Sequence, residues 1–554
     1  MAGLRGGLAF HAVYVTISLV CPFHRPTANG KADPETTLNG AELIVQTAKK
    51  AGIDICFANA GTTEMPVVQA LDTQPGIKAV LGLFEGVCTG AADGYGRMLE
   101  RPAVALLHLG PGLANGIANL HNARRARTPL VALIGQHATW HRANDPPLAM
   151  DIEALAGTVS GWKRTNQSPG DLSKDFAEAV AASMYGQIAT LIVPNDYQSE
   201  ESAVTEIATP RFQFDPVDSA RIEEAARLLR GSKKAALLMG GKALRKRGLQ
   251  AAARIKAATG CDLLCDMFLA LAERGRGLPD VPRIPYFPEP ALKLLSAYDA
   301  VVLAGTGEPV TFFGYRGVPG RLLTEDQRRV QLATERQNVA EALEHLAESL
   351  NAPRRPKVPV GRSAKADRPR VPSGELTPEK ACQTLAALQP EDAILVDEGL
   401  TTSFAYYPLT AGSPPHSYLT IAGGSIGYGM PCAVGAALAC PGRRVINLQA
   451  DGSAMYTVQA LWTQAHEALD VTTLLCSNRS YNILRVELIR AGVASIGPSA
   501  LSLIDIDRPA IDWVKLGEGL GVPAVSVRTA ERLALELRKA LAEPGPHLIE
   551  MLLV

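Results

Sequence analysis

The chain has 554 residues, of which 47% are hydrophobic and 20% are charged, so it is an ordinary globular protein with room for about three or four domains. Lys and Arg together number 55, as do Asp and Glu, and this zero net charge argues against a nucleic-acid-binding surface. Most of the nine cysteines lie in apolar segments, which favours a reduced, cytoplasmic enzyme over a disulfide scaffold.

Residues 1–36 differ from the rest of the chain. Leu8 to Phe23 is apolar and follows Arg5, as the apolar core of a signal peptide does, but no small-residue cleavage pattern is evident. The segment is also shorter than the ~20 apolar residues that span a bilayer comfortably. We therefore expect a disordered N-terminal extension and no membrane association.

From Leu38 onwards, helical and strand patterns alternate in three blocks. This alternation is typical of α/β domains in which helices cover both faces of a parallel sheet. We place the blocks at residues 37–205, 217–350 and 375–554. Residues 351–374 are rich in Pro, Arg and Lys and are expected to form a solvated linker.

Glu85 is the first residue with a chemical signal. It lies in the otherwise apolar passage from Val80 to Cys88, between a predicted strand and a predicted helix. A lone carboxylate in apolar surroundings is costly unless it is paired or protonated, so Glu85 indicates a proton-transfer role. Alternatively, Glu85 is an ordinary acidic residue in the first turn of a helix.

A glycine-dense loop, Ala422 to Pro431, leads into a helix of small residues in the third block. Its glycines allow the backbone to approach a ligand closely, and the bulky Ile426 stands among them. Tight packing of a helix on a sheet would explain the same glycines.

Two polar residues follow consecutive predicted strands of the third block. Asp451 comes directly after the buried strand that ends near Ala450, and Asn478 comes after the strand that begins at Val471. Adjacent parallel strands would place both side chains at one sheet edge, where open α/β sheets bind ligands. Carboxylate and amide oxygens suit a hard cation that carries phosphates.

Together these segments resemble the thiamine-diphosphate-dependent decarboxylases and carboligases, a superfamily that includes acetolactate synthase, pyruvate decarboxylase and benzoylformate decarboxylase. The resemblance covers residues 38–554 and implies three doubly wound parallel-sheet α/β domains, namely the pyrimidine-binding, central and diphosphate-binding domains. It implies thiamine diphosphate and Mg²⁺ as cofactors. In this superfamily two chains contribute to each site, so the resemblance also implies a homodimer or homotetramer.

The resemblance carries site residues over one by one. It implies that Asp451, Asn478 and the carbonyl of Ser480 bind Mg²⁺. Gly424 would accept a hydrogen bond from the 4′-amino group of the cofactor, and Glu85 would protonate its N1′ atom. The remaining positions expected to bind the cofactor are Thr401, Thr402, Ile426, Gly452, Ser453 and Tyr481.

Within the superfamily, two segments resemble benzoylformate decarboxylase: Asn59 to Pro66 and Leu106 to Gly112. They place Thr62 and His108 at catalytic, substrate-facing positions, although a lone histidine at a strand end can also be structural. The second histidine of that enzyme has no counterpart, because the matching segment 307–314 contains none.

Acetolactate synthase is favoured by the segment Pro129 to Gln136 and opposed by Ser480 to Leu488, which lacks the Gln-Trp specificity element of those synthases. Ala450 and Ser477 replace a usual Gly and Asn, and neither change removes an expected Mg²⁺ ligand. We expect Leu484 and Glu487 to line the substrate pocket.

The sequence therefore predicts a Mg²⁺- and thiamine-diphosphate-dependent enzyme that decarboxylates a small 2-oxo acid without oxidation. The product is either an aldehyde or a compound ligated to a second carbonyl. One alternative is a flavin-dependent oxidase of the same architecture that uses residues 217–350 for FAD, but no decisive flavin motif supports FAD binding. The other is a non-catalytic homologue that binds the cofactor.

Overall fold

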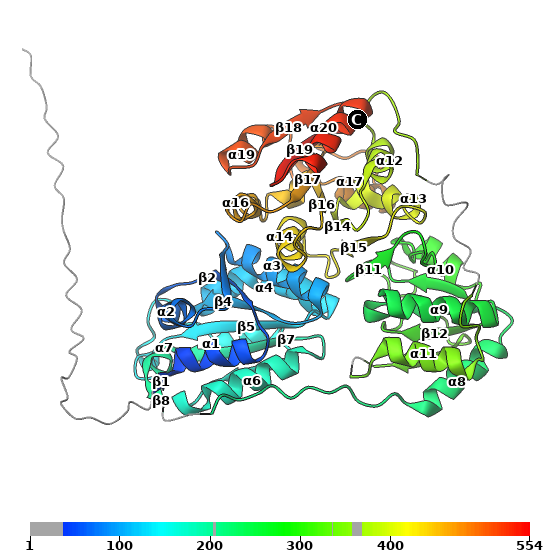
Figure 1. The fold of residues 1–554 in the computed structure, drawn as a ribbon. Coiled ribbons are helices and arrows are strands. Elements are labelled where there is room, and N and C mark those ends of the chain that lie inside the picture. The colour runs from blue at the N-terminus through cyan, green and yellow to red at the C-terminus, as the bar shows by residue number, and fades with distance from the viewer. Residues whose placement is uncertain (1–36, 203–205, 335, 357–367) are drawn as a thin grey trace, which may run out of the picture. The chain divides into compact units, whose positions relative to one another are not determined.

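The computed structural model of the protein describes residues 37–202, 206–334, 336–356 and 368–554. Residues 38–554 form one compact unit (Figure 1). The predicted N-terminal extension and residues 357–367 of the predicted linker lie outside the described residues.

The first sheet contains six parallel strands in the order β3-β2-β4-β5-β7-β6. Its strands are β2 (Ile55–Asn59), β3 (Lys78–Leu81), β4 (Ala103–His108), β5 (Leu130–Gln136), β6 (Trp162–Thr165) and β7 (Ile188–Pro194). Two short strands that precede and follow this sheet in the sequence, β1 (Leu38–Asn39) and β8 (Glu201–Ser202), form an antiparallel pair. Strands such as β5 are buried along nearly their whole length, as expected for a sheet covered on both faces.

Helices cover both faces of this sheet. One face carries α1 (Gly40–Lys50), α2 (Met65–Thr73), α6 (Leu172–Ser183) and α7 (Asn195–Ser199). The other face carries α3 (Glu85–Leu99), α4 (Leu109–Ala126) and α5 (Ile152–Gly157). Short 3-10 turns are η1 (Thr62–Glu64), η2 (Arg142–Asn144) and η3 (Pro169–Asp171). Helix α1 shows how the sequence specifies a boundary, because Asn39 and Glu42 form a reciprocal capping box at its start.

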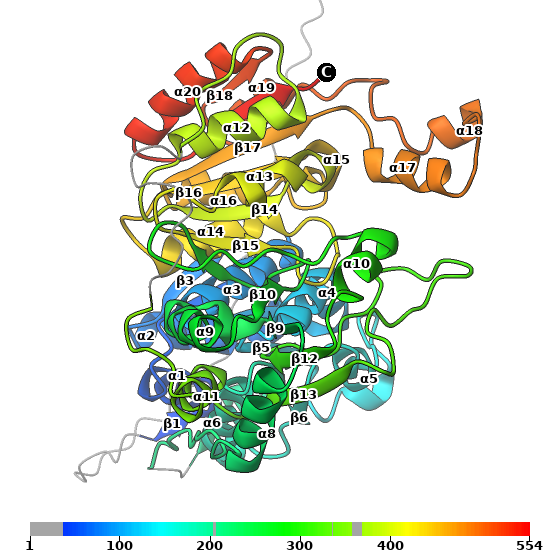
Figure 2. The same ribbon diagram turned by 90° about the vertical axis from the view of Figure 1, so that its right-hand side faces the viewer.

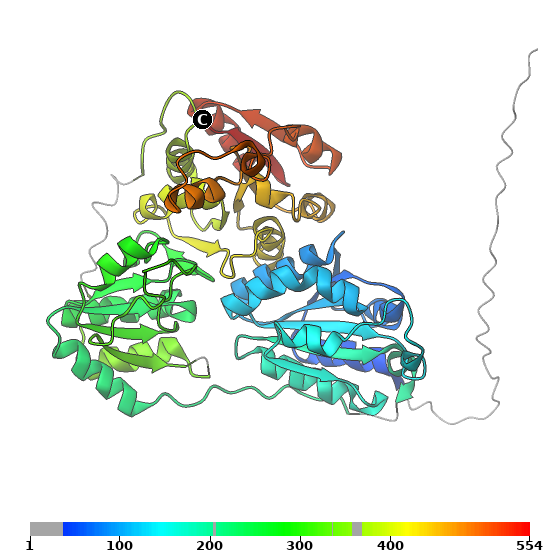
Figure 3. The ribbon, with the colours of Figure 1, turned by 180° about the vertical axis from the view of Figure 1, so that it is seen from behind.

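The second sheet has four parallel strands in the order β10-β9-β12-β13. Its strands are β9 (Ala235–Met239), β10 (Asp262–Cys265), β12 (Ala300–Ala304) and β13 (Arg328–Ala333). One face carries α8 (Ser219–Arg230), α9 (Lys246–Thr259) and α11 (Val339–Ser349), and the other carries α10 (Pro288–Leu295). The 3-10 turn η4 (Gly241–Leu244) follows β9. Figure 3 shows the extended segment 206–218, which leads from the first sheet to α8.

The third sheet has seven strands in the order β11-β15-β14-β16-β17-β19-β18. Its strands are β11 (Ala272–Arg274), β14 (Ile394–Glu398), β15 (His416–Thr420), β16 (Val445–Ala450), β17 (Val471–Ser477), β18 (Ala524–Val527) and β19 (His547–Leu552). All neighbours are parallel except β11, which pairs antiparallel with β15. Strand β11 falls within the second block of the sequence, so this sheet recruits an edge strand from outside its own block.

Helices again cover both faces of the third sheet. One face carries α12 (Pro378–Leu388), α13 (Tyr406–Leu409) and α20 (Ala530–Ala542), and the other carries α14 (Gly429–Ala439), α16 (Ala460–His466) and α19 (Trp513–Gly519). The remaining elements are η5 (Leu400–Ala405), α15 (Asp451–Ala454), α17 (Asn482–Arg490) and α18 (Pro498–Leu501). Figure 2 shows α17 and α18 apart from the helices that cover the sheet, and α17 has no buried residue.

Helices α3 and α14 pack with their backbones in close contact. A Cβ atom on Gly94 would lie 2.2 Å from the carbonyl oxygen of Cys432, and one on Gly435 would lie 1.9 Å from that of Ala91. The two glycines are therefore required for this approach, which joins the first and third sheets. No helix within the described ranges is long and apolar enough to cross a membrane.

Candidate active site

Asp451 and Asn478 lie at the same edge of the third sheet, as predicted. β16 and β17 are adjacent and parallel, with Ala450 opposite Cys476 at the end of their ladder. Asp451 follows β16 directly, and Asn478 follows β17 directly. The register therefore brings a carboxylate and an amide to neighbouring strand ends.

The Asp451 carboxylate is buried without a positively charged partner among the described residues. The side chain accepts backbone hydrogen bonds from Gly452 at 2.8 Å and Arg479 at 2.6 Å, and the residue is 2% exposed. Burial raises the pKa of Asp451 to about 6, although these two hydrogen bonds oppose the rise. A cation bound here would offset the cost of burying this charge, so the donor set fits Mg²⁺.

Asn478 and Ser480 border a cavity of about 540 Å³ that Thr401 and Thr402 also line. The Asn478 Oδ1 atom accepts a hydrogen bond from the backbone of Ser480 at 3.0 Å, so the turn after β17 is closed on itself. Arg485, on α17, also borders this cavity, where its guanidinium group pairs with Asp505 and donates to the Ser480 hydroxyl at 3.2 Å. The structure thus gathers residues expected to bind the metal and the diphosphate around one space.

Gly452 and Tyr481 are in contact, because a Cβ atom on Gly452 would lie 2.5 Å from the Tyr481 ring. The Tyr481 hydroxyl donates to the Gly452 carbonyl at 3.3 Å. The Ser453 hydroxyl accepts from Gln449 at 2.7 Å and donates to the Ala450 carbonyl at 3.1 Å. It is therefore engaged within the protein, and the backbone of α15 is the part of this segment that could face a phosphate.

The glycine-dense loop is held by a buried carboxylate that the sequence analysis did not single out. Glu398, at the end of β14, accepts hydrogen bonds from the backbone of Gly427 at 2.7 Å and Gly429 at 2.6 Å. Gln449 donates to the same carboxylate at 2.9 Å. Burial raises the pKa of Glu398, although these hydrogen bonds oppose the rise. Because these contacts span 29 to 51 positions of the chain, no local pattern reveals them.

Gly424 has φ +74°, a conformation that favours glycine, and Ile426 is partly buried in the same loop. A Cβ atom on Gly424 would lie 2.5 Å from the Phe312 ring, so Phe312 lies against the loop backbone. Phe312 comes from the segment in which the sequence analysis found no second histidine. An aromatic ring therefore occupies this part of the site, and it contacts Phe268 and Tyr286 with ring centroids 5.4 and 5.6 Å away.

Two asparagines on α4 hold the other side of the loop. Asn119 donates to the Gly86 carbonyl at 2.9 Å and to the Gly427 carbonyl at 3.1 Å. Asn122 donates to the Ser425 carbonyl at 2.7 Å. The first turn of α3 and the glycine-dense loop are therefore fastened to the same helix.

Glu85 is the first residue of α3 and is half-buried in the single chain. Glu85 is therefore an acidic residue in the first turn of a helix, which was the alternative interpretation of its sequence position. Its surroundings are less apolar than the sequence suggests. Asn115 donates to Glu85 Oε2 at 3.0 Å. A Cβ atom on Gly112 would lie 3.4 Å from both Glu85 Oε1 and His108 Cβ, so the two side chains border the same small space.

His108 is the last residue of β4, and its ring contacts side chains of η1. Its Nδ1 atom is 2.8 Å from Glu64 Oε2 and 3.1 Å from Thr63 Oγ1. Thr62 is exposed, whereas Thr63 and Glu64 are buried. The sequence analysis selected Thr62 and missed Glu64, although the Gly61-to-Glu64 spacing is that of a capped helical turn.

A further histidine follows β5. His137 lies close enough to His108 and His141 for their charges to lower its pKa, after the larger effect of burial. Its Nε2 atom is buried and has no hydrogen-bond partner among the described residues. The ends of β4 and β5 thus carry two histidines, where the sequence analysis counted one.

The two expected pocket residues lie on α17. Leu484 is 44% exposed, and Glu487 accepts a hydrogen bond from the Tyr315 hydroxyl at 3.0 Å. Arg490 lies over the rings of Phe287 and Tyr315, at 4.3 and 4.9 Å from their centroids. These contacts tie α17 to the aromatic segment around Phe312.

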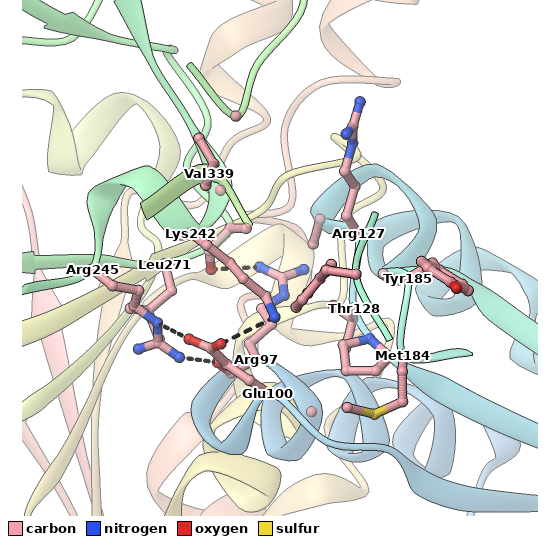
Figure 4. A pocket seen from close by; sticks show the side chains of 18 of the residues that line it. Arg97, Glu100, Arg127, Thr128, Met184, Tyr185, Lys242, Arg245, Leu271 and Val339 are labelled. Atoms are coloured by element: carbon pink, nitrogen blue, oxygen red, sulfur yellow. Dashed lines mark hydrogen bonds and ion pairs between the residues drawn. The ribbon is translucent and has the colours of Figure 1, made fainter. Parts of the chain in front are cut away.

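A separate pocket lies between the end of α3 and the region after β9 (Figure 4). Glu100 pairs there with Lys242 at 3.1 Å and Arg245 at 2.9 Å, and Arg245 also donates to the Arg97 carbonyl at 2.6 Å. These ion pairs join the first and second sheets, and none of the predicted site residues lines this pocket.

Two domain families and several known proteins match this chain. The thiamine pyrophosphate enzyme N-terminal TPP binding domain matches residues 38–155, and the C-terminal TPP binding domain matches residues 399–551. A Mycobacterium tuberculosis protein, provisionally named acetolactate synthase large subunit IlvX, is 50% identical over 93% of this chain and 99% of its own. A benzoylformate decarboxylase from Pseudomonas aeruginosa is 28% identical over 91% of this chain and 96% of its own.

Among solved structures, the thiamine diphosphate-dependent 4-hydroxybenzoylformate decarboxylase of Rhodococcus jostii superposes with a TM-score of 0.81 at 24% identity. The match covers 93% of this chain and 99% of that one, and it shows the shared fold. Taken with the extensive match to the mycobacterial relative, these findings show that the chain belongs to the family of thiamine pyrophosphate enzymes.

Proposed function

We propose that the protein uses Mg²⁺ and thiamine diphosphate to decarboxylate a 2-oxo acid without oxidation. The observation that carries this proposal is the buried Asp451 carboxylate beside Asn478, at adjacent strand ends and with no cation beside it in the part of the chain that the structure describes. Thr401 and Thr402 border the same cavity as Asn478, which supports their assignment to the diphosphate.

The chain's own residues would hold the cofactor in three places. Asp451, Asn478 and the Ser480 carbonyl would bind Mg²⁺, the backbone around Gly424 would hold the aminopyrimidine, and Glu85 would exchange a proton with N1′. When bound, thiamine diphosphate supplies a carbon nucleophile for the substrate carbonyl and a cationic ring that holds the electrons released with CO₂. The aromatic rings around Phe312 would exclude water from the reacting carbon, which favours loss of a carboxylate.

The direct test is a substrate panel. Purified protein reconstituted with thiamine diphosphate and Mg²⁺ should release CO₂ from at least one of pyruvate, branched-chain 2-oxo acids and benzoylformate. Chromatography of the products distinguishes a lyase, which yields the aldehyde, from a carboligating transferase, which yields a hydroxyketone. Failure to release CO₂ from any 2-oxo acid, with cofactor bound, would refute the proposal.

Cofactor retention gives a second test that does not depend on turnover. Asp451→Ala should lose thiamine diphosphate on gel filtration, as measured by cofactor fluorescence, because the diphosphate is held through the metal. Asp470→Ala, which removes a partly buried carboxylate that is paired with Arg444 just before β17, should retain it. Equal retention by both variants would contradict the assignment of Asp451.

We also propose that two copies of the chain share each site. Glu85 is only half-buried in the single chain, and α17 leaves Leu484 and Ile489 at 44% and 65% exposure. A second copy would cover these groups and complete the site. All eight described cysteines are free, which supports our further proposal of a reducing, cytoplasmic location.

A further inference from the structure

Glu64 is fully buried, at 0% exposure, and its partners within the described residues are hydrogen-bond donors and the His108 ring. Its Oε2 atom accepts from the Gly61 backbone at 2.8 Å and lies 2.8 Å from His108 Nδ1. Its Oε1 atom accepts from the Thr63 hydroxyl at 2.5 Å. A carboxylate with three such partners is satisfied in its ionised form.

These contacts assign the proton on His108. Nδ1 faces a carboxylate oxygen and a Thr63 oxygen whose own hydrogen is donated to Glu64, so both neighbours are acceptors. A hydrogen bond therefore forms only when Nδ1 carries the proton. In the neutral ring, Nε2 is then the free acceptor.

The backbone leaves room for this pair at two glycines. A Cβ atom on Gly61 would lie 2.4 Å from the His108 ring, and one on Gly135 would lie 1.8 Å from Glu64 Oε1. Any larger residue at either position would displace the ring or the carboxylate. The Glu64–His108 pair therefore depends on η1, β4 and β5 together. These three elements are separate in the sequence and meet only in the folded chain.

The other edge of the His108 ring faces away from Glu64, because Nδ1 and Nε2 lie on different sides of an imidazole. The side chain is 23% exposed, and Nε2 has no hydrogen-bond partner in the described part of the chain. His108 Cβ borders the same space as Glu85 Oε1. The free nitrogen is therefore available beside the residue that we assign to the cofactor.

We infer that Glu64 is a positioning residue, which keeps the proton of His108 on Nδ1 and presents Nε2 as the group that exchanges a proton with the substrate. This inference rests on the proposed function for the identity of the substrate. Glu64 acts only through His108 and touches no reacting atom. The same arrangement of a buried carboxylate behind an imidazole orients catalytic histidines in other enzymes.

A tautomer measurement tests the inference without turnover. In full-length protein labelled with ¹⁵N-histidine, the signal absent from His108→Gln should show a protonated Nδ1 and an unprotonated Nε2. Glu64→Ala should remove this preference. Glu64→Gln should keep it, because the Gly61 N–H requires the amide oxygen, and not the NH₂ group, at the position beside His108. An unchanged His108 signal in Glu64→Ala would overturn the inference.

A double-mutant cycle separates positioning from a merely structural role. Glu64→Ala should lower kcat by about a hundredfold with a smaller change in KM, in the range expected for loss of an oriented acid-base group. In a His108→Ala background the same change should cost about twofold or less, because the residue through which Glu64 acts is gone. An equal loss in both backgrounds would show that Glu64 only supports the fold.

Asp175→Asn is the matched control, since Asp175 is another buried carboxylate of the same sheet unit, at 5% exposure, bonded to Arg164 and Asn166. It should leave the His108 signal unchanged. If no 2-oxo acid is turned over by any variant, the proposed function fails, and the tautomer measurement alone decides the role of Glu64.

Discussion

At the scale of single residues, the chemistry of this site depends on two carboxylates, Glu85 and Asp451, that have no cation beside them among the described residues. Glu85 has one neutral hydrogen-bond partner, Asn115, and no cation among the described residues. Asp451 is buried, and its side chain's hydrogen-bond partners within the described ranges are backbone N–H groups. Asp93, in contrast, is neutralised by Arg97 where α3 packs against α14. We propose that the cofactor completes Glu85 and that a metal completes Asp451.

The first prediction concerns Glu85. Glu85→Gln should lower kcat by about 10²- to 10⁴-fold, because the amide cannot exchange a proton with the cofactor. Its circular dichroism and urea midpoint should stay at wild-type values, since the side chain is only half-buried. Glu531→Gln makes the same change in the first turn of α20 and should leave kcat unchanged. Full activity in Glu85→Gln would contradict its assigned role.

Secondary-structure elements determine how closely the sheets approach one another. Helices α3 and α14 are in backbone contact through Gly94 and Gly435, and each begins beside a predicted part of the site. α3 starts with Glu85, and α14 follows the glycine-dense loop. Their packing therefore fixes how Glu85 and the glycine-dense loop are placed relative to one another within one chain.

We predict that Gly435→Ala destabilises the protein by about 1–3 kcal/mol, because its methyl group would overlap the Ala91 carbonyl and the helices would have to separate. Gly519→Ala is the control: this glycine lies at the end of α19 with open space around it. There the change should be neutral or stabilising by up to about 1 kcal/mol. Urea unfolding measures both, and equal effects would show that close packing of α3 and α14 contributes little.

A pH effect follows from Asp266, which comes directly after β10 and is bonded to the Thr306 hydroxyl. Burial raises its pKa to about 6, from 3.8, so the folded protein keeps this proton over a range in which the unfolded chain releases it. The free energy of unfolding therefore falls as pH rises from about 4 through about 6, by at most about 3 kcal/mol.

Asp266→Asn should remove this dependence. The variant should be close to wild type in its urea midpoint at pH 4, and more stable than wild type at pH 8, where the ionised carboxylate carries its full desolvation cost. Parallel stability profiles for the two proteins between pH 4 and pH 8 would show that Asp266 is not the group responsible.

At the scale of the whole molecule, the proposed site combines residues from the units of the first and third sheets. The unit of the second sheet adds the aromatic rings around Phe312. Whether one chain or two supply a given site can be tested by complementation. Glu85→Gln and Asp451→Ala are each expected to be inactive alone. If two chains share each site, a mixed dimer contains one site with both defects and one site with neither.

We therefore expect that co-expression of the two variants restores activity to about a quarter of the wild-type level, since half of randomly formed dimers are mixed and each has one intact site. Co-expression of Glu85→Gln with untagged Glu85→Gln provides the control and should stay inactive. No recovery from the mixed variants, with mixed dimers confirmed by affinity tags, would mean that each chain builds its own site.

Several features followed from the sequence because they depend on local order. The alternation of strands and helices predicted parallel-sheet α/β architecture, since each pattern reflects burial within one element. Asp451 and Asn478 were found because residues that directly follow adjacent parallel strands must share a sheet edge. The roles assigned to these residues remain predictions for the experiments above.

Only the tertiary structure decided which distant residues meet. Glu64 reaches His108 across 44 positions, Glu398 holds the loop at Gly427, and Phe312 lies against Gly424 from another sheet unit. β11 also leaves its own block to join the third sheet. No periodicity encodes such contacts, because they depend on the relative placement of whole elements. The sequence by itself thus determined the fold class and the residues at the strand ends, whereas the packing of three sheets determined the neighbours that orient them.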